Sequence, residues 1–149
     1  MHFIQNLVPI PRLSKVVALS FYLLHSVLHA QTAPKGIHFT SGDFQKAMSL
    51  AQSANKPLFV EVYLNGCPHC EALAPILTEK QVGDFYNTHF ISWKVEANSK
   101  ESAALQKVKG ITYPEFPLLL FFDPKGTLIH LATPAEPANK AAFVEEVVK

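Results

Sequence analysis

Two cysteines, separated by a proline and a histidine, carry the clearest chemical signal in this sequence. Cys67 and Cys70 are the only cysteines among the 149 residues, so they react with each other, with another molecule or with a metal. At this spacing two thiols can close a small disulfide ring and open it again. Because so small a ring adds little stability, the pair is better suited to reversible dithiol–disulfide chemistry than to a structural cross-link.

The residues around the cysteines predict the elements that position the two sulfurs. Residues 57–64 form an apolar run typical of a buried strand, and residues 71–77 have helical character. Cys67 therefore falls at a helix N-terminus, where unpaired backbone N–H groups and the helix dipole favour a thiolate over a thiol. This placement predicts that Cys67 is the exposed nucleophile. Cys70, nearly one turn further on, is expected to be the more buried, resolving thiol.

The first thirty residues have the character of a secretory signal. Two basic residues precede an uncharged apolar run at residues 16–28, and the small Ala30 stands where a cleavage site is expected. The run is shorter than the ~20 residues of a membrane span, so residues 1–30 are predicted to be a signal peptide. An uncleaved anchor is the alternative. We expect an exported protein of the bacterial periplasm, either soluble or held by this N-terminal segment.

The remainder is predicted to be a short arm at residues 31–36 and a single domain at residues 37–149. Apolar residues make up 48% of the chain, which fits a folded domain rather than a disordered one. Without the signal, basic and acidic residues nearly balance. A near-neutral domain has no electrostatic basis for binding nucleic acid.

Turn signals and hydrophobic spacing predict alternating strands and helices along this domain. After a short strand at 37–39, Thr40 is a candidate N-cap, with Asp43 three residues later, for a helix that ends at residues 55–57. Gly83 and Asp84 predict a break after the cysteine-led helix. The later elements are a strand at 90–95, a helix at 99–109, a strand at 118–122, a turn at 123–126, an antiparallel strand at 127–131 and a helix at 140–148. A mixed sheet covered by helices on both faces is expected.

This order, with the cysteine pair after the second strand, resembles the thioredoxin fold over residues 37–149. Thioredoxin-like proteins carry a buried acid, a helix-kinking proline, a cis-proline before the fourth strand and a lysine that faces the acid. The matching positions here are Glu61, Pro75, Pro117 and Lys94. The resemblance implies an α/β domain, a central mixed sheet flanked by helices, that carries out thiol–disulfide exchange.

The residues between the cysteines are similar to those of a second thioredoxin-like family. Pro68 and His69 complete a Cys-Pro-His-Cys motif, which together with a glutamate as the buried acid is similar to the periplasmic disulfide oxidases of the DsbA type. Those oxidases insert a helical domain before the cis-proline, and the stretch from Cys70 to Pro117 is too short to hold it. We therefore expect a compact protein with a DsbA-like active-site sequence, whose direction of electron transfer is open.

Pro68 and His69 are expected to tune the reactive sulfur, and Glu61 to handle its partner's proton. An imidazole beside Cys67 would stabilise the thiolate, and a more stable reduced form makes the disulfide a stronger oxidant. The alternative for His69 is an exposed side chain with a small effect. A glutamate within an apolar strand is costly to bury unless it is paired or protonated. Burial would raise its pKa and suit it to accept the proton of Cys70, whereas a Glu61 at a sheet edge would have no such role.

The resemblance also implies roles for Lys94, Phe116 and Pro117. Lys94 would moderate the pKa of the buried acid. With Pro117 in cis, the Phe116 backbone would lie beside the sulfurs, where an extended substrate could pair with it; Pro114 is the competing candidate for the cis bond. The alternative for Phe116, and the preferred interpretation for Trp93, is packing in the core.

These observations predict an exported thiol–disulfide oxidoreductase that exchanges the Cys67–Cys70 pair with protein thiols and disulfides. It would act without a cofactor or metal, as a monomer, with a membrane redox partner as electron donor if it is a reductant. A copper or zinc carrier that uses the same sulfurs and His69 is the alternative. A closed zinc site needs four ligands, and His89 and His130 are scattered along the sequence.

Overall fold

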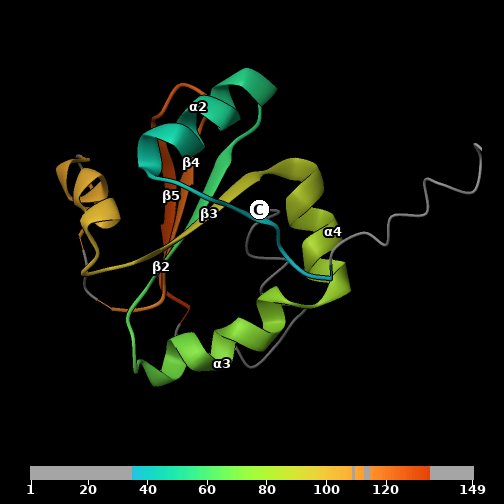
Figure 1. The fold of residues 1–149 in the computed structure, drawn as a ribbon, viewed down its shortest axis with the longest axis vertical. Helices are drawn as coiled ribbons and strands as arrows, with labels where there is room; N and C mark the ends of the chain where they lie inside the picture. Colours follow the sequence, from blue (N-terminus) through green and yellow to red (C-terminus); the bar gives the residue numbers. More distant parts are fainter. Residues whose placement is uncertain (1–34, 109, 113–114, 135–149) are drawn as a thin grey trace, which may run out of the picture. The chain divides into compact units, whose positions relative to one another are not determined.

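A computed structural model describes residues 35–108, 110–112 and 115–134 (Figure 1). The predicted signal, most of the arm and the predicted helix at 140–148 lie outside these residues and stay predictions. The described elements, in chain order, are β1 (Phe39–Thr40), α2 (Phe44–Ala54), β2 (Leu58–Tyr63), α3 (Pro68–Leu77), α4 (Lys80–His89), β3 (Ile91–Glu96), the 3-10 helix η1 (Lys100–Lys107), β4 (Leu118–Phe122) and β5 (Leu128–Ala132).

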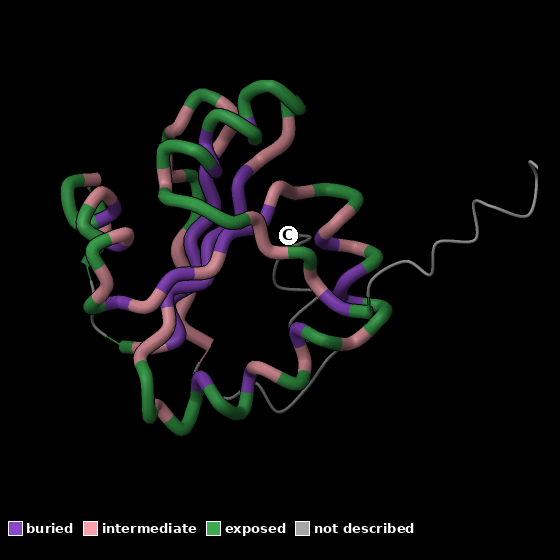
Figure 2. The backbone as a smooth tube through the Cα atoms, viewed as in Figure 1, coloured by how far each residue is buried: buried purple, intermediate pink, exposed green. Residues whose placement is uncertain are grey.

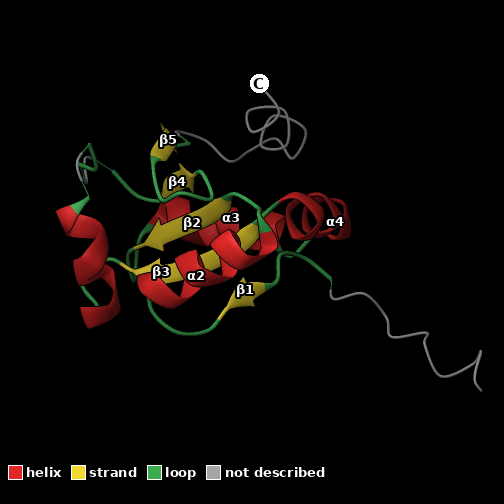
Figure 3. Cartoon of the chain, turned by 90° about the horizontal axis from the view of Figure 1, so that it is seen from above, coloured by secondary structure: helices red, strands yellow, loops and turns green. Residues whose placement is uncertain are grey.

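The five described strands form one mixed sheet in the order β1-β3-β2-β4-β5, which Figure 3 shows from one edge to the other. The strands β1, β3 and β2 are parallel, whereas β4 runs antiparallel to β2, and β5 antiparallel to β4. The predicted turn joins β4 to β5, with Gly126 N–H donating to the Asp123 carbonyl at 3.0 Å. The predicted mixed sheet is confirmed, and β2, which leads to the cysteines, lies at its centre.

Two apolar clusters cover the two faces of the sheet, and Figure 2 shows that the buried residues follow its central strands. One cluster joins α2 and η1 to one face; the other joins α3 and α4 to the opposite face. Because side chains alternate along a strand, Leu58, Val60 and Val62 face the first cluster and Phe59 faces the second. Glu61 lies two residues after Phe59 and therefore on the same face of the strand, which places its carboxylate under the cysteine-led helix.

The helix α2 begins three residues later than the sequence predicts. Asp43, not Thr40, is the N-cap, and its carboxylate accepts a hydrogen bond from Lys46 N–H at 2.9 Å. Thr40 instead belongs to β1, and its hydroxyl donates to the Ser92 carbonyl at 3.1 Å. Threonine and aspartate are both favoured at an N-cap. Because Thr40 is held in β1 by its pairing with β3, Asp43 caps the helix instead. The predicted end of the helix is correct, since Asn55 is the C-cap in the left-handed region.

The break predicted at Gly83 and Asp84 is wrong, because both residues lie inside α4. Gly83 is buried, and a Cβ added there would overlap the backbone of Gly36. The glycine therefore permits close packing of two segments instead of ending a helix. The chain consequently has two helices between β2 and β3 where the sequence predicts one.

The segment that enters β1 is fixed to the ends of α3 and α4 by hydrogen bonds. Ile37 N–H donates to the Leu77 carbonyl at 2.8 Å, at the C-terminal end of α3. The Asn87 amide donates to the Gly36 carbonyl at 3.0 Å and accepts from His38 N–H at 2.8 Å. We call residues 36–38 with Asn87 the entry clamp. It holds the start of the described domain at the end of α3 opposite to the cysteines.

The helix predicted at residues 99–109 is a 3-10 helix, η1. Its buried residues are Ser102 and Leu105, three positions apart, as the threefold repeat of a 3-10 helix requires. The Ser102 hydroxyl is satisfied by the Ala97 carbonyl at 2.6 Å. In the part of the chain that the structure describes, no helix is long and apolar enough to cross a membrane.

Candidate active site

The two cysteines lie where β2 passes into α3, as predicted. Cys67 is the N-cap of α3 and Pro68 occupies its first turn, a position that needs no backbone N–H. The Cys67 sulfur accepts a hydrogen bond from Cys70 N–H at 3.3 Å. This contact gives the sulfur one of the backbone donors that a helix N-terminus leaves unpaired, and such a donor stabilises negative charge on sulfur.

A second segment, far away in sequence, meets Cys67 from the other side. The Cys67 thiol donates to the Phe116 carbonyl at 3.4 Å, and the Phe116–Pro117 peptide bond is cis. The predicted cis bond is thus confirmed at Pro117, directly before β4. The backbone of Phe116 lies beside the sulfur, as the resemblance implies, while its role toward a substrate stays a prediction.

The two thiols have different surroundings. Cys67 is half-buried, whereas Cys70 has only 6% of its surface exposed. Burial is the main cause that raises the pKa of the Cys70 thiol to about 11. A side-chain hydrogen bond with Cys67 and the charge on Glu61 act in the same direction. Cys70 is therefore held as a thiol at neutral pH and needs a base before it can attack a disulfide.

Glu61 supplies a buried carboxylate on the same face of the sheet. Its side chain is fully buried, and its Oε1 accepts from the Lys94 ammonium at 3.0 Å. The two residues are direct partners in the β2–β3 register, so the lysine that the resemblance implies does face the acid. Desolvation raises the pKa of the Glu61 carboxyl, and the Lys94 charge partly opposes this. Within the described residues the other oxygen, Oε2, has no hydrogen-bond partner.

Two aromatic rings complete the surroundings of Lys94. Its Nζ lies 4.7 Å from the centre of the Tyr63 ring and 5.9 Å from that of Phe39. About a third of the side chain is exposed. The rings attract a cation through their faces, so they help to hold the Lys94 side chain in place beside Glu61. Sequence reasoning did not identify Tyr63, although its place two residues after the acid puts it on the same strand face.

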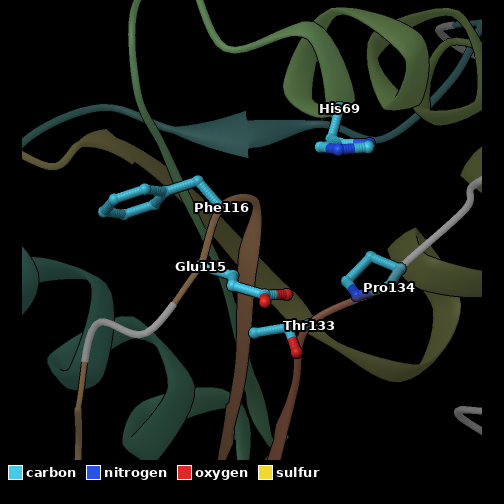
Figure 4. A pocket seen from close by; sticks show the side chains of 5 residues that line it. All are labelled: His69, Glu115, Phe116, Thr133 and Pro134. Carbon is cyan, nitrogen blue, oxygen red and sulfur yellow. The ribbon is translucent and has the colours of Figure 1, made fainter.

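His69 lines a pocket beside the sulfurs. The pocket has a volume of about 340 Å³ (Figure 4) and is lined by His69, Glu115, Phe116, Thr133 and Pro134. Sequence reasoning missed three of these residues. Glu115 directly precedes the identified pair Phe116–Pro117, which is the signal that could have revealed it, whereas no local pattern marks Thr133 and Pro134 after β5.

The other residues considered from the sequence lie away from this site. Trp93 is buried in the cluster under α2, and its indole N–H donates to the Gly42 carbonyl at 2.9 Å. His89 lies against Phe85 and His130 against Phe121. In residues 35–134, apart from the three that are not described, no three side chains of the kinds that bind metals come together.

The sequence matches the thioredoxin-like family over residues 39–124, more than half of the chain. The chain belongs to the thioredoxin-like family. This confirms the fold that the sequence predicts. The match spans β1 to the turn after β4, and it includes both cysteines, the buried acid and the cis-proline.

Solved structures of thioredoxin-like proteins are similar to this chain. A candidate disulphide isomerase from Bacteroides thetaiotaomicron is 28% identical with a TM-score of 0.60, over 76% of this chain and 94% of that one. A DsbH oxidoreductase is 21% identical with a TM-score of 0.59, over 76% and 84%. A thioredoxin from Thermus thermophilus is 20% identical with a TM-score of 0.62, over 76% and 85%. A comparison with curated proteins found no match. Family, paired thiols and neighbours together assign the chain to the thiol–disulfide oxidoreductases.

Proposed function

We propose that this thioredoxin-like protein is an exported thiol–disulfide oxidoreductase that exchanges its Cys67–Cys70 pair with protein substrates. The observation that carries the proposal is the asymmetry of the two thiols. Cys67 is partly exposed at the helix N-terminus, with a backbone donor on its sulfur. Cys70 is buried, with its pKa raised to about 11. Cys67 is therefore suited to attack a substrate disulfide, and Cys70 to attack the Cys67 sulfur afterwards.

The first step joins the enzyme to its substrate. The Cys67 thiolate attacks one sulfur of a substrate disulfide, and the new S–S bond forms as the old one breaks. The other substrate sulfur leaves as a thiolate with the electron pair of the broken bond. The Phe116 carbonyl beside Cys67 offers an acceptor for a backbone N–H of an extended substrate, which would hold the attacked disulfide in place.

The second step releases the substrate and needs a base. The Cys70 thiol gives its proton to Glu61, whose Oε2 is free within the described residues and whose pKa is raised by burial. The Cys70 thiolate then attacks the Cys67 sulfur, the Cys67–Cys70 disulfide forms, and the remaining substrate sulfur leaves as a thiolate. The substrate gains two electrons and the enzyme loses two; the reverse sequence oxidises a substrate dithiol.

Export to the bacterial periplasm is part of the proposal and is supported by the sequence alone. The apolar run at residues 16–28 and the small residue Ala30 are typical of a secretory signal. If the protein is an oxidant, its Cys67–Cys70 pair would be present as a disulfide in this oxidising compartment. If it is a reductant, it would need a membrane redox partner to supply electrons. We take the protein to act as a monomer, and its reduction potential decides between the two directions.

The copper or zinc carrier is not favoured. The ligands proposed for it were the two sulfurs and His69, yet the described residues bring no cluster of metal-binding side chains together. His69 lines a pocket with Glu115 instead.

Two variants and a measurement of the reduction potential test the proposed function. Insulin reduction by the purified chain with dithiothreitol should be lost in Cys67→Ser, whereas Cys70→Ser should accumulate a mixed disulfide with its substrate. Activity that survives Cys67→Ser would contradict the proposal. Equilibration with glutathione then gives the direction of transfer. A reduction potential of about −120 mV is typical of a strong oxidant such as DsbA, and one of about −270 mV of a thioredoxin reductant.

A further inference from the structure

The pocket beside Cys67 contains the carboxylate of Glu115, a charge that the proposed chemistry does not use. Figure 4 shows the His69 imidazole on one side of the pocket and the Glu115 carboxylate with the Thr133 hydroxyl on the opposite side. The Phe116 ring points away, so this residue contributes mainly its backbone. A volume of about 340 Å³ lies at the low end for ligand sites and suits a single side chain of a peptide.

The pocket is within reach of a substrate bound at the nucleophile. Phe116, which lines it, places its carbonyl 3.4 Å from the Cys67 sulfur. His69, on the opposite wall, is two residues after Cys67 on α3. An extended peptide advances about 3.3 Å per residue. A side chain one or two residues from the attacked cysteine would therefore come within reach of this pocket.

Glu115 places a carboxylate on the wall of this pocket. The residue is exposed, and within the described part of the chain its carboxylate makes no ion pair. A carboxylate accepts hydrogen bonds only, and the neighbouring Thr133 hydroxyl can accept as well. An ammonium or guanidinium group satisfies both, and charge-assisted hydrogen bonds of this kind are stronger than neutral ones.

We propose that Glu115 is a specificity-determining residue that selects substrates with lysine or arginine within two residues of the cysteine attacked by Cys67. This inference rests on the proposed function and deepens it, since it names the chemistry of the preferred substrate. An acidic side chain in the same place would face the Glu115 carboxylate and slow the exchange.

Peptides with one variable residue on each side of a cysteine test the proposal. The cysteine carries thionitrobenzoate as a mixed disulfide, so attack by Cys67 on the peptide sulfur releases coloured thionitrobenzoate. The chain carries Cys70→Ser, which stops the reaction at the peptide–Cys67 disulfide. With lysine, glutamine or glutamate as the variable residue, we expect rate constants in that order. A surface pair of this kind predicts lysine over glutamine by roughly 3-fold, and lysine over glutamate by roughly 10-fold.

Three comparisons separate a local effect of Glu115 from a general one. Glu115→Gln should reduce the lysine-to-glutamate ratio to below about 3-fold, and Glu115→Lys should invert it. Glu71→Gln makes the same charge change on an exposed residue in the first turn of α3, outside the pocket. This variant should keep most of the lysine-to-glutamate ratio of rate constants. Raising the salt from about 20 mM to 500 mM should also reduce the ratio, since screening acts on exposed charges.

Each contrary result overturns the inference in a different way. Equal rates for the three peptides would show that the pocket does not read charge. Equal loss of the ratio in the Glu71 and Glu115 variants would assign it to the overall field of the protein. Faster reaction with glutamate would assign the pocket to His69 and the helix N-terminus. If the glutamine peptide releases no thionitrobenzoate, the proposed function fails together with this inference, whereas a loss of selectivity alone leaves the function in place.

Discussion

Replacing the buried acid Glu61 by leucine should make the reduced protein more stable at alkaline pH. Glu61 is fully buried, its Oε1 is paired with Lys94, and its Oε2 has no hydrogen-bond partner in the described residues. An unsatisfied buried polar group costs about 1–3 kcal/mol, and apolar replacement of buried ion pairs is often neutral or stabilising by about 1–4 kcal/mol. Lys94 is partly exposed, so its ammonium can turn to water. We expect Glu61→Leu to raise the free energy of unfolding by about 2 kcal/mol at pH 8.

The gain should depend on pH with a defined sign. Burial raises the pKa of Glu61 in the folded protein above its value in the unfolded chain. Between these two values the folded state holds a proton that the unfolded state has lost, so the stability of the wild type falls as the pH rises. Above both values the full cost is present, and below both it is absent. The difference between Glu61→Leu and the wild type should therefore be large at pH 8 and small near pH 4.

Urea unfolding of the reduced proteins measures this difference. Trp93 is the chain's single tryptophan and is 2% exposed, so its fluorescence reports on the core under α2. With a slope of about 1–3 kcal/mol per molar urea, a gain of about 2 kcal/mol moves the midpoint by roughly 1 M. Glu61→Gln, which keeps a polar group without the charge, is the matched control and should show a smaller gain.

Removal of the partner should have the opposite effect. Lys94→Met leaves the Glu61 carboxylate buried without its cation, which costs up to about 3–5 kcal/mol where the carboxylate stays charged; protonation of Glu61 limits the loss at lower pH. The reasoning would be refuted if Glu61→Leu were less stable than the wild type at pH 8. It would equally be refuted if the difference between the two proteins were the same at pH 4 and pH 8.

The remaining predictions concern the second thiol, an aromatic contact and a close packing. Iodoacetamide at pH 8 should label Cys67 first, and labelling of Cys70 should rise about tenfold per pH unit toward its pKa of about 11; equal labelling by mass spectrometry at pH 8 would contradict this. Tyr63→Leu should lower the free energy of unfolding by about 0.5–1 kcal/mol more than Tyr63→Phe, which keeps the ring over Lys94; equal losses would exclude the contact. Gly83→Ala should destabilise the fold by about 1–3 kcal/mol by overpacking, and an unchanged melting temperature would contradict the packing.

The sequence was most informative where local chemistry and function coincide. A strand that runs into a Cys-x-x-Cys pair predicts the position of both sulfurs, and Glu61 is conspicuous because a carboxylate is costly inside an apolar strand. The family pattern added Lys94 and the cis bond at Pro117, and the structure contains both geometries. Their catalytic roles stay predictions.

Features that depend on distant segments could not be predicted. Gly83 has the local character of a helix break, and only its packing on Gly36 explains its place inside α4. The pocket joins residues of α3, the segment before β4 and the segment after β5. No periodicity or spacing along one segment encodes the meeting of Glu115 with Thr133, because sequence patterns report on neighbours along the chain.

The entry clamp fixes where the described domain begins relative to the reactive sulfur. α3 has ten residues, a length of about 15 Å, with Cys67 at one end and the Leu77 carbonyl, bonded to Ile37, at the other. A support attached ahead of Lys35 is thus joined to the pole of the domain remote from the reactive sulfur. A linker engineered onto Lys35 would therefore leave the end of α3 that carries the sulfur accessible to large folded substrates.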